Sequence, residues 1–381
     1  MQFPKNQTSS SIVIIHFQPL ELYPPVCNLL DYLTKNSQDK IIVITTENRK
    51  DTQLPLYRNI SKQILIKRTP AIVSTSSLRL WHYLFFYLKG LQILLKNQPD
   101  SILYFDTISS WPALMYKKIK AKVKLLAHYH EYCSPQEYAT NMFLVKRMHK
   151  QETKMYSDSY HWISQTNEVR LQKMIRDNHL ENVGRAVFHT MPNYPSRYWA
   201  RRKTNYGTSE KLRLVYVGSL GYDTMYLKEL TEWILQNKNQ FTLDLYSHNI
   251  DDKASAFLGS LQADNVQFHG AVNYRELAGV LANYDVGLVI YKPVSDNWIQ
   301  NAPNKVFEYL ACGLDVWFSK TMRFCLSLAT KETFPKIIPV DFENLEDVDF
   351  KKAVTREGLL HKETHFFYEN IYPDILAALT K

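Results

Sequence analysis

Apolar and polar positions alternate along this chain in blocks rather than residue by residue. Short runs rich in β-branched residues, such as Ile12-Val13-Ile14-Ile15, contain no polar positions, as expected of parallel strands buried on both faces. Longer amphipathic stretches separate these runs. Strands that alternate with helices predict an α/β fold with doubly wound parallel sheets. The predicted strands are residues 12–17, 41–46, 63–67, 102–106, 123–128, 162–164, 186–189, 213–217, 241–246, 265–269, 285–290, 315–318 and 336–340.

The series of strands is interrupted once, near the middle of the chain. Two prolines, Pro192 and Pro195, flank Asn-Tyr, and the polar stretch 201–211 follows without any core pattern. We therefore expect two Rossmann-like domains facing across a cleft, at residues 1–195 and 206–364. The amphipathic stretch 365–381 is expected to cross back to the first domain. Ligands of such sheets bind beyond the carboxyl ends of the strands.

The sharpest chemical signal lies in residues 301–313, which predict a helix with clear ends. Pro303 is tolerated only in a first turn, and Gly313 suits the position after the last turn. Asn301 and Asn304 mark the start of this segment. A helix N-terminus attracts phosphate, because its free N–H groups carry partial positive charge.

The same helix carries Lys305 in its first turn and Glu308 one turn later. The lysine adds a full positive charge for a diphosphate, and the carboxylate can accept two hydrogen bonds from a diol such as ribose. The alternative is an exposed Lys–Glu ion pair on an ordinary helix, worth a few tenths of a kcal/mol. The spacing alone leaves both interpretations open.

The string Pro-Asn-Lys-Val-Phe-Glu-Tyr-Leu-Ala-Cys-Gly resembles the donor-binding helix of the group 1 (family 4-like) bacterial glycosyltransferases, which are mostly retaining GT-B enzymes. The resemblance implies that Glu308 binds ribose and that Lys305 faces the diphosphate. Residues 214–221 look like the glycine loop of the same domain, which implies a phosphate contact at Gly218 and Ser219. The loops at His248 and at Gly270 to Val272 would hold the base and ribose, although a solvated loop histidine is the alternative for His248.

The predicted strand 123–128 runs into His128-Tyr129-His130-Glu131. The family often has a His-Asp or His-Glu pair there, which implies that His130 and Glu131 contact the transferred sugar, with His128 as second choice. The alternative is that these histidines simply end a strand. With Lys305 beside the leaving group, His130 and Glu131 complete the expected catalytic set.

Two departures from the family pattern remove charge from the expected phosphate site. Gln300 stands where many members have an acid, and Ser219 stands where many have an arginine. Residues 223–225 also lack the usual lysine. The diphosphate would then depend on Lys305, helix dipoles and backbone amides.

Composition adds three expectations. The net charge of +9 comes without a nucleic-acid-binding motif, so the expected partners are a nucleotide-sugar donor and a glycan or lipid-linked acceptor rather than nucleic acid. No apolar run is long enough to span a membrane and residues 1–11 do not resemble a signal peptide, so a cytoplasmic location is expected. The cysteines Cys27, Cys133, Cys312 and Cys325 have no paired spacing, and we expect buried thiols, no metal and no cofactor.

Residues 80–88 form an apolar stretch that is hydrophobic almost all round. Together with Lys146, Arg147, Lys150 and Lys154 it could form a peripheral surface on the inner face of a membrane. The alternative is a helix buried against the sheet. A second acidic motif, Asp347-Val348-Asp349, is interpreted as a solvated loop.

These observations favour a metal-independent, retaining glycosyltransferase that uses a nucleoside-diphosphate sugar in bacterial surface polysaccharide synthesis. Two alternatives stay open: a non-catalytic nucleotide-binding relative, which the missing charges at Gln300 and Ser219 favour, and a nucleotide-sugar epimerase.

Overall fold

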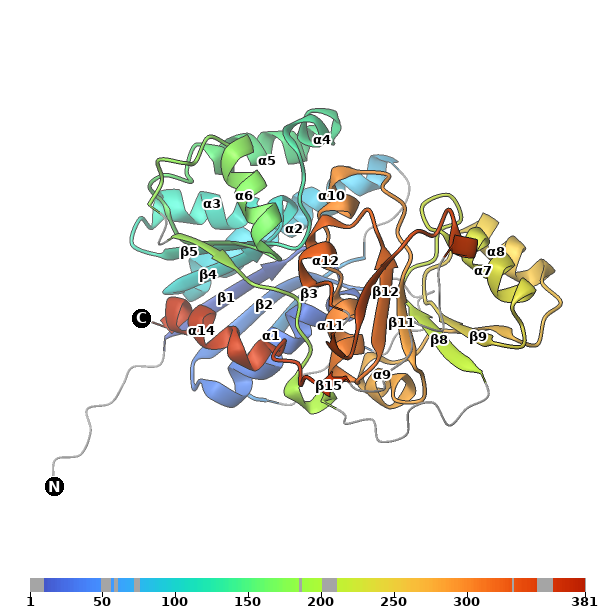
Figure 1. Cartoon of the computed structure of the whole chain (residues 1–381). Coiled ribbons are helices and arrows are strands. Elements are labelled where there is room, and N and C mark those ends of the chain that lie inside the picture. Colours follow the sequence, from blue (N-terminus) through green and yellow to red (C-terminus); the bar gives the residue numbers. More distant parts are fainter. Residues whose placement is uncertain are drawn as a thin grey trace, which may run out of the picture. The chain divides into compact units, whose positions relative to one another are not determined.

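The computed structural model describes residues 10–48, 56–57, 61–71, 76–184, 187–200, 211–330, 332–347 and 359–380. They form two compact units, coloured along the chain in Figure 1. The first comprises the described residues within Met1–Asp51, Leu56–Pro192 and Ile371–Lys381, and the second those within Asn193–Asn370. The acidic motif at residues 347–349 lies almost wholly outside the described ranges.

In the described part of the first unit, seven parallel strands pair in the order β3-β2-β1-β4-β5-β6-β7. Residues Ile12 to Ile15 of β1 have no solvent exposure, as their unbroken apolarity requires. The strands are β1 (Ser11–His16), β2 (Lys40–Thr46), β3 (Ile64–Thr69), β4 (Ser101–Phe105), β5 (Lys124–Tyr129), β6 (Tyr160–Gln165) and β7 (Phe188–Thr190).

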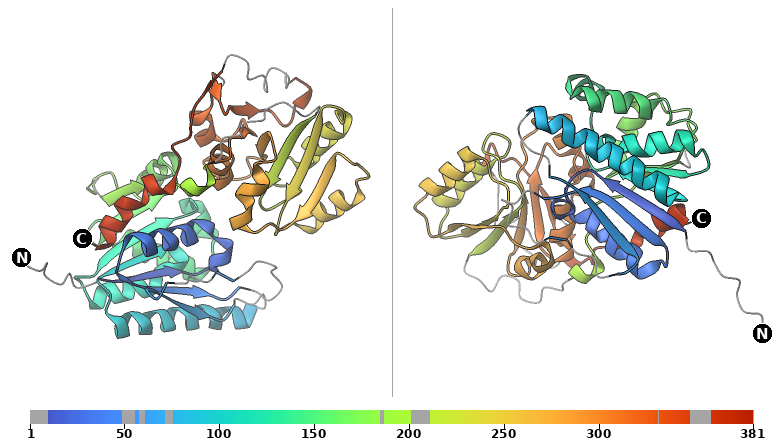
Figure 2. Two further views of the ribbon diagram at one scale, coloured as in Figure 1. Left: turned by 90° about the horizontal axis from the view of Figure 1, so that it is seen from below. Right: turned by 180° about the vertical axis from the view of Figure 1, so that it is seen from behind.

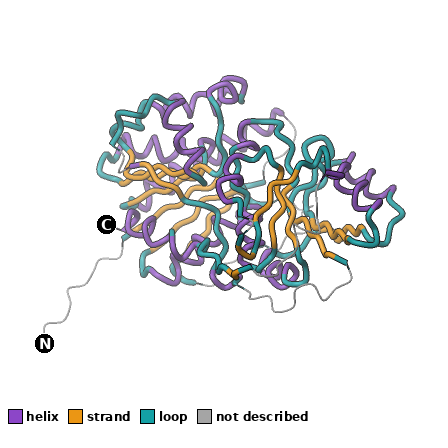
Figure 3. Tube along the Cα trace, viewed as in Figure 1, coloured by secondary structure: helices purple, strands orange, loops and turns teal. Residues whose placement is uncertain are grey.

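Helices cover both faces of this first sheet (Figures 1 and 3). On one face lie α2 (Ser76–Asn97), α3 (Ser110–Ile119), α5 (Phe143–Thr153) and α6 (Glu168–Asp177). On the other lie α1 (Pro24–Asn36) and α14 (Tyr372–Thr380), whose side chains meet at the Tyr32–Tyr372 ring contact. The Ser101 hydroxyl donates to the Leu379 carbonyl at 2.5 Å, so the C-terminal helix is bound to β4. Short elements of this unit are η1 (Leu20–Leu22), η2 (Thr107–Ser109) and α4 (Pro135–Thr140).

The second unit has a six-stranded parallel sheet among its described residues, ordered β10-β9-β8-β11-β12-β14. Its strands are β8 (Leu212–Val217), β9 (Phe241–Tyr246), β10 (Val266–Gly270), β11 (Val286–Val289), β12 (Asp315–Ser319) and β14 (Ile337–Val340). One face packs against α7 (Leu227–Gln236) and α8 (Asp252–Ser260). The other packs against α9 (Tyr274–Leu281), α11 (Asn304–Ala311) and α12 (Arg323–Leu328).

Smaller elements complete the second unit. They are α10 (Asp296–Ile299), η4 (Arg197–Trp199), η5 (Leu345–Asp347), η6 (Tyr368–Asn370) and the two-stranded pair β13 (Thr333–Phe334) with β15 (Leu360–His361). The sequence pattern did not predict the two-residue strands, because such short segments carry no periodicity.

The strands of both large sheets were predicted, and the α/β fold with two Rossmann-like sheets is confirmed. In each sheet the chain order reverses once, between β1 and β4 in the first unit and between β8 and β11 in the second. Such a reversal opens a crevice at the carboxyl ends of the two strands, where doubly wound sheets bind ligands. One expectation is corrected: Cys312 and Cys325 are buried, but Cys27 and Cys133 are only half-buried.

Helix α11 lies unusually close to the second sheet. A Cβ atom added to Gly287 in β11 would lie 2.1 Å from the ring of Tyr309 in α11. Only glycine allows this approach, and the helix is thereby seated directly on the strand.

We predict that Gly287→Ala lowers the free energy of unfolding by about 1–3 kcal/mol, because the aromatic ring must move out of a filled core. Urea denaturation measures the change. The matched control is Gly279→Ala in α9, where an added Cβ meets nothing within 4 Å and the exchange is expected to stabilise the helix by up to about 1 kcal/mol. Equal changes in unfolding free energy at both positions would contradict the explanation that Gly287 allows α11 to lie close to β11.

Candidate functional site

The described residues of the second unit place the predicted donor-binding side chains at the carboxyl ends of its strands. Tyr309 fixes α11 there through two hydrogen bonds: its hydroxyl accepts from the Val217 N–H at 3.1 Å and donates to the Leu288 carbonyl at 3.4 Å. These bonds tie the helix to β8 and β11, the two strands at the reversal of chain order. The first turn of α11 therefore lies at the crevice of the second sheet.

Lys305 lies in that first turn, buried among aromatic rings. Its Nζ donates to the Tyr216 hydroxyl at 3.0 Å and lies 4.1 Å from the Tyr216 ring centroid and 4.8 Å from that of Tyr291. Tyr216 lies in β8 and Tyr291 follows β11 by two residues, so the two rings come from the two strands at the reversal of chain order. Burial lowers the pKa of Lys305 to about 7, and the nearby Glu308 carboxylate opposes this shift. The ammonium therefore has few water contacts, and an anion bound beside it would strongly stabilise its charged form.

Gly218 follows β8 directly beneath this ammonium. Its φ of +138° is one that residues with a side chain rarely adopt, and an added Cβ would lie 2.6 Å from the Nζ of Lys305. The Tyr216 hydroxyl donates to the Ser219 carbonyl at 2.6 Å, which holds the turn. Gly218, Ser219 and Lys305 therefore lie close together.

Glu308 lies one turn further along α11 and is also buried. Burial raises the pKa of its carboxyl to about 7, while Lys305 and a hydrogen bond from Tyr274 act in the opposite direction. The alternative of an exposed Lys–Glu ion pair is wrong, because both side chains are buried. Two buried groups of opposite charge, each disfavoured by burial, are typical of a ligand site rather than of a helix surface.

The other predicted donor residues follow the same edge of the sheet. The Gly218 N–H donates to the Tyr246 carbonyl at 3.0 Å, and the Ser247 N–H donates to the Gly270 carbonyl at 2.8 Å. The loops after β8, β9 and β10 are thus joined in order. The remaining predicted residues lie as follows: His248 is exposed in the loop after β9, Gly270 has a φ of +71°, Val272 is half-buried near α9 and α11, and Asn301 and Asn304 are half-buried at the start of α11.

In the first unit, three histidine rings gather at the carboxyl ends of β1 and β5. The ring of the predicted His130 lies 5.0 Å from that of His128 and 5.7 Å from that of His16, and it stacks on Phe105 at 5.0 Å. The Nε2 atom of each histidine is buried and has no hydrogen-bond partner among the described residues. Burial lowers the pKa of His16 to about 4, that of His128 to about 3 and that of His130 well below its usual range. All three are neutral imidazoles at pH 7.

The backbone of His130 is held from two sides. Its N–H donates to Asp106 Oδ1 at 2.8 Å, and its carbonyl accepts from Arg170 Nη1 at 2.9 Å. Asp106 has a φ of +58°, a strained conformation for this residue that is typical of functional sites. Burial and the negative charge of Glu131 raise the pKa of Asp106 to about 7. The side chain of Glu131 itself is exposed.

Several neighbours of the predicted residues were not singled out from the sequence. In the second unit these are Tyr216, Tyr274 and Tyr291, and in the first His16, Asp106 and Arg170. Asp106 ends a predicted strand and His16 lies one residue before the end of another, and these positions were the signal that could have identified them. The tyrosines gave no signal, because an aromatic residue beside a strand is usually part of the core.

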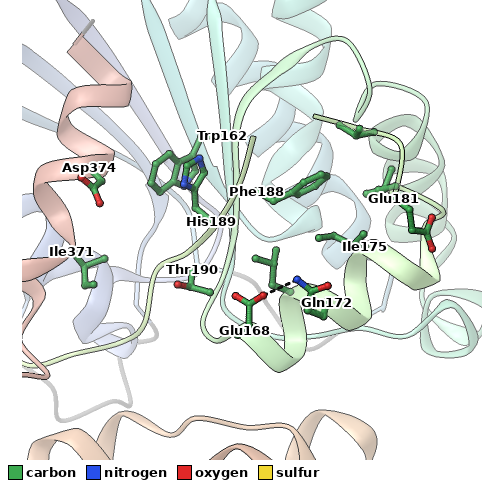
Figure 4. Close-up of a pocket in the computed structure, with 13 residues that line it drawn as sticks. Trp162, Glu168, Gln172, Ile175, Glu181, Phe188, His189, Thr190, Ile371 and Asp374 are labelled. Atoms are coloured by element: carbon green, nitrogen blue, oxygen red, sulfur yellow. Dashed lines mark hydrogen bonds between the residues drawn. The ribbon is translucent and has the colours of Figure 1, made fainter. Parts of the chain in front are cut away.

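The first unit also contains a pocket of about 590 Å³ that holds none of the predicted residues (Figure 4). It lies between β6, β7, α6 and the start of α14. The rings of Trp162 and His189 stack at 3.5 Å, and the Glu168 carboxylate accepts a hydrogen bond from Gln172 at 2.6 Å. Asp374 and Glu181 also line the pocket.

No group of three or more His, Cys, Asp or Glu side chains in the described ranges is arranged to hold a metal ion. Among the same residues, none of the helices has both the length and the apolarity of a membrane-spanning segment.

Known proteins resemble this chain in structure rather than in sequence. No family model matches it, and the search of curated proteins finds no match either. Solved structures match over nearly the whole chain, and three illustrate their range. The apo lipopolysaccharide outer core galactosyltransferase WaaB has a TM-score of 0.62 at 12% identity, covering 97% of this chain and 99% of its own.

Sucrose-phosphate synthase from Thermosynechococcus elongatus has a TM-score of 0.61 at 15% identity, covering 98% of this chain and 95% of its own. The chain has a GT-B glycosyltransferase-like fold. UDP-GlcNAc 2-epimerase from Methanocaldococcus jannaschii is also similar, with a TM-score of 0.58 at 12% identity and coverage of 97% and 99%. Solved structures that resemble this chain thus include transferases and an epimerase, so the fold alone does not identify a reaction.

The buried histidines of this GT-B protein make its stability depend on pH. In the unfolded chain each histidine takes up a proton below its ordinary pKa of about 6.5, but the folded cluster stays neutral until lower pH. The unfolded state then binds more protons, so stability is lost as the pH falls from about 6.5 toward 4.

We predict that His128→Gln reduces the loss of unfolding free energy between pH 7 and pH 5 by about 2 kcal/mol. Urea denaturation at both pH values measures it, and the comparison within each variant removes any constant destabilisation. His361→Gln, at an exposed histidine in β15, is the control and should leave the pH dependence unchanged. The same loss in all three proteins would contradict the neutral state of the cluster.

Proposed function

We propose that this chain is a metal-independent glycosyltransferase that moves a sugar from a nucleoside-diphosphate sugar to a glycan or lipid-linked acceptor. The observation that carries the proposal is the buried Lys305 ammonium at the crevice between β8 and β11, which faces the glycine turn at Gly218. A buried cation beside glycine backbone is suited to a diphosphate, which can approach the backbone closely and neutralise the charge.

The donor is proposed to lie along the carboxyl edge of the second sheet. The diphosphate contacts Lys305, the amides after Gly218 and the start of α11, while Glu308 accepts hydrogen bonds from the ribose hydroxyls. The loops at His248 and at Gly270 to Val272 then surround the base. Support comes from the hydrogen bonds that join the loops after β8, β9 and β10.

During transfer the bond between the sugar and the diphosphate breaks, and the diphosphate leaves with the electron pair. Lys305 stabilises the negative charge that develops on this leaving group, and its low water contact strengthens the effect. In this proposal Lys305 and oriented amides perform the charge neutralisation that other enzymes assign to a metal. The neutral imidazole of His130 and the Glu131 carboxylate contact the transferred sugar, and the product retains the anomeric configuration.

The acceptor is proposed to belong to surface polysaccharide synthesis. The structural similarity to a lipopolysaccharide galactosyltransferase supports this choice. A second candidate reaction is epimerisation of the nucleotide sugar itself, which the three histidines and Asp106 favour because they offer several acid–base groups in one place. The released product separates the two reactions.

The first test is calorimetric titration with UDP, GDP, ADP and CMP in the absence of metal. We expect selective binding of one diphosphate and a loss of affinity of about tenfold or more in Lys305→Ala and in Glu308→Ala, since each removes a charge-assisted contact. Lys238→Ala, at an exposed lysine of the same unit, is the matched control. Unchanged affinity in both site variants would overturn the donor site.

Nucleotide affinity is also expected to pass through a maximum near pH 7. Lys305, with a pKa of about 7, loses its charge as the pH rises, and Glu308, also near 7, loses its charge as the pH falls. Both charged forms are needed for the proposed contacts. We expect the same titration between pH 5.5 and 9 to show two results for Glu308→Gln. Most of the fall in affinity at acidic pH disappears, and the fall in affinity at alkaline pH remains. If the nucleotide affinity of the Glu308→Gln variant still falls to the same extent at acidic pH, another group causes that fall.

His130→Ala separates binding from chemistry. We expect this variant to keep the diphosphate affinity of the wild type and to lose turnover of the matching nucleotide sugar by about 100-fold or more, as for other groups that act on the reacting sugar. Release of free diphosphate with a suitable acceptor is the measurement. If the wild-type protein binds the diphosphate but does not turn over any matching nucleotide sugar, it is a non-catalytic relative.

A further inference from the structure

Helix α2 has two apolar sides, and only one of them packs against the first sheet. Tyr83, Phe86, Tyr87 and Leu94 face inward and are buried in the core. The opposite side carries a second apolar series at helical spacing that remains exposed. Its members are Leu78, Trp81, Phe85, Leu88 and Leu95, with Trp81 68% and Leu88 62% exposed.

Within residues 80–88 the helix is therefore both packed against the sheet and apolar toward the outside. A tryptophan, a phenylalanine and three leucines in one exposed stripe are unusual for a surface with no partner. The helix runs along the outside of the first unit, as Figure 2 shows.

Helix α5 extends the exposed apolar surface. Phe143 in its first turn is 71% exposed, and Met142 precedes it. Between α2, α3 and α5 lies a groove of about 320 Å³ lined by Leu88, Trp111 and Phe143, with Arg147 on its rim. We call the exposed residues of α2 together with Phe143 and the basic residues of α5 the α2–α5 surface.

The exposed charges on the three helices that form this surface have one sign. Helices α2, α3 and α5 together contain eight Lys or Arg residues and a single acid, Glu152. Glu152 has no solvent exposure, because it accepts hydrogen bonds from Tyr104, Tyr129 and Thr107 inside the core. Arg79, Lys89, Lys146, Arg147 and Lys150 are all exposed. On the described surface of these three helices there is therefore no exposed carboxylate.

We propose that the α2–α5 surface binds the headgroup region of an anionic lipid bilayer. Trp81, Phe85, Leu88 and Phe143 would enter the boundary between headgroups and acyl chains, where amphipathic aromatic rings are favoured. The surrounding Lys and Arg side chains would meet lipid phosphates, with their alkyl stems along the apolar part. The bound helix lies flat on the membrane and does not cross it.

A second copy of the chain is the competing occupant, because an exposed apolar stripe can also form a dimer. A symmetric dimer places the same patch against itself, so the basic rim of one copy would meet the basic rim of the other without an opposing carboxylate. An anionic bilayer complements the same charges. The charge pattern therefore favours lipid over self-association.

This inference does not depend on the proposed function. The α2–α5 surface and the Lys305 site are in different units, so a protein that binds no nucleotide could still bind vesicles, and the reverse also holds. If both proposals are correct, the membrane surface explains how the enzyme would meet a lipid-linked acceptor.

The test is co-sedimentation of the full chain with phosphatidylcholine vesicles that contain or lack phosphatidylglycerol. We expect binding only to the anionic vesicles, weakened by added salt. Trp81→Ser/Phe85→Ser/Leu88→Ser should lower binding by about tenfold or more through lost apolar contact. Lys146→Glu/Arg147→Glu/Lys150→Glu should lower it by at least about tenfold through lost charge attraction.

The matched control is Leu326→Ser/Lys238→Glu, which removes an exposed leucine and reverses an exposed lysine of the second unit. This control should bind like the wild type, and circular dichroism should show that every variant is folded. All these exchanges are at exposed positions, so they leave the core intact. Absence of vesicle binding by the wild type would overturn the proposal. The proposal would also be overturned if light scattering showed a dimer of the wild type and no dimer of the Trp81→Ser/Phe85→Ser/Leu88→Ser variant.

Discussion

The contact between Tyr309 and Gly287 is the constraint on which the candidate donor site depends. The ring lies where a side chain at Gly287 would be, so α11 approaches β11 more closely than any other residue would allow. From this position the Tyr309 hydroxyl reaches both Val217 and Leu288 and fixes the helix over the reversal of strand order. Lys305 and Glu308, in the first turns of the same helix, are both buried there, and the rings of Tyr216 and Tyr291 lie against Lys305.

Burial then determines the chemistry of both units. Lys305, Glu308, Asp106 and the histidines all have pKa values displaced in the direction that disfavours their charged forms, and burial is the largest cause each time. Opposite charges only partly offset this effect, as between Lys305 and Glu308. A site of this kind is costly to the folded state when empty, and an anionic ligand at Lys305 would relieve the cost. This incompletely compensated burial of charge argues for a ligand more strongly than any single residue does.

The sequence predicted the sheets well because their strands are apolar without alternation, and only a strand covered on both faces needs such a pattern. It also predicted α11, because Pro303 and Gly313 mark its two ends. It could not predict the neighbours of Lys305, since the contact with Tyr216 joins residues 89 positions apart. His16 and Asp106 were missed for a related reason: His16 ends β1 and Asp106 directly follows β4, and only the order of strands brings them to His130. Strand order is a property of pairing, which periodicity does not record.

Helix α2 shows a second limit of sequence patterns. Apolar positions almost all round this helix left two alternatives open, a membrane-touching surface or a helix buried on one side against the sheet. The structure separates the positions into an inner series that fills the core and an outer series that does not. The distinguishing evidence is the charge of the neighbours, because acids are absent from the sequence of α2 and α3 and the single acid of α5 is turned inward. A helix that only covered a sheet would gain nothing from excluding carboxylates, whereas a helix that meets lipid phosphates would be repelled by each exposed one.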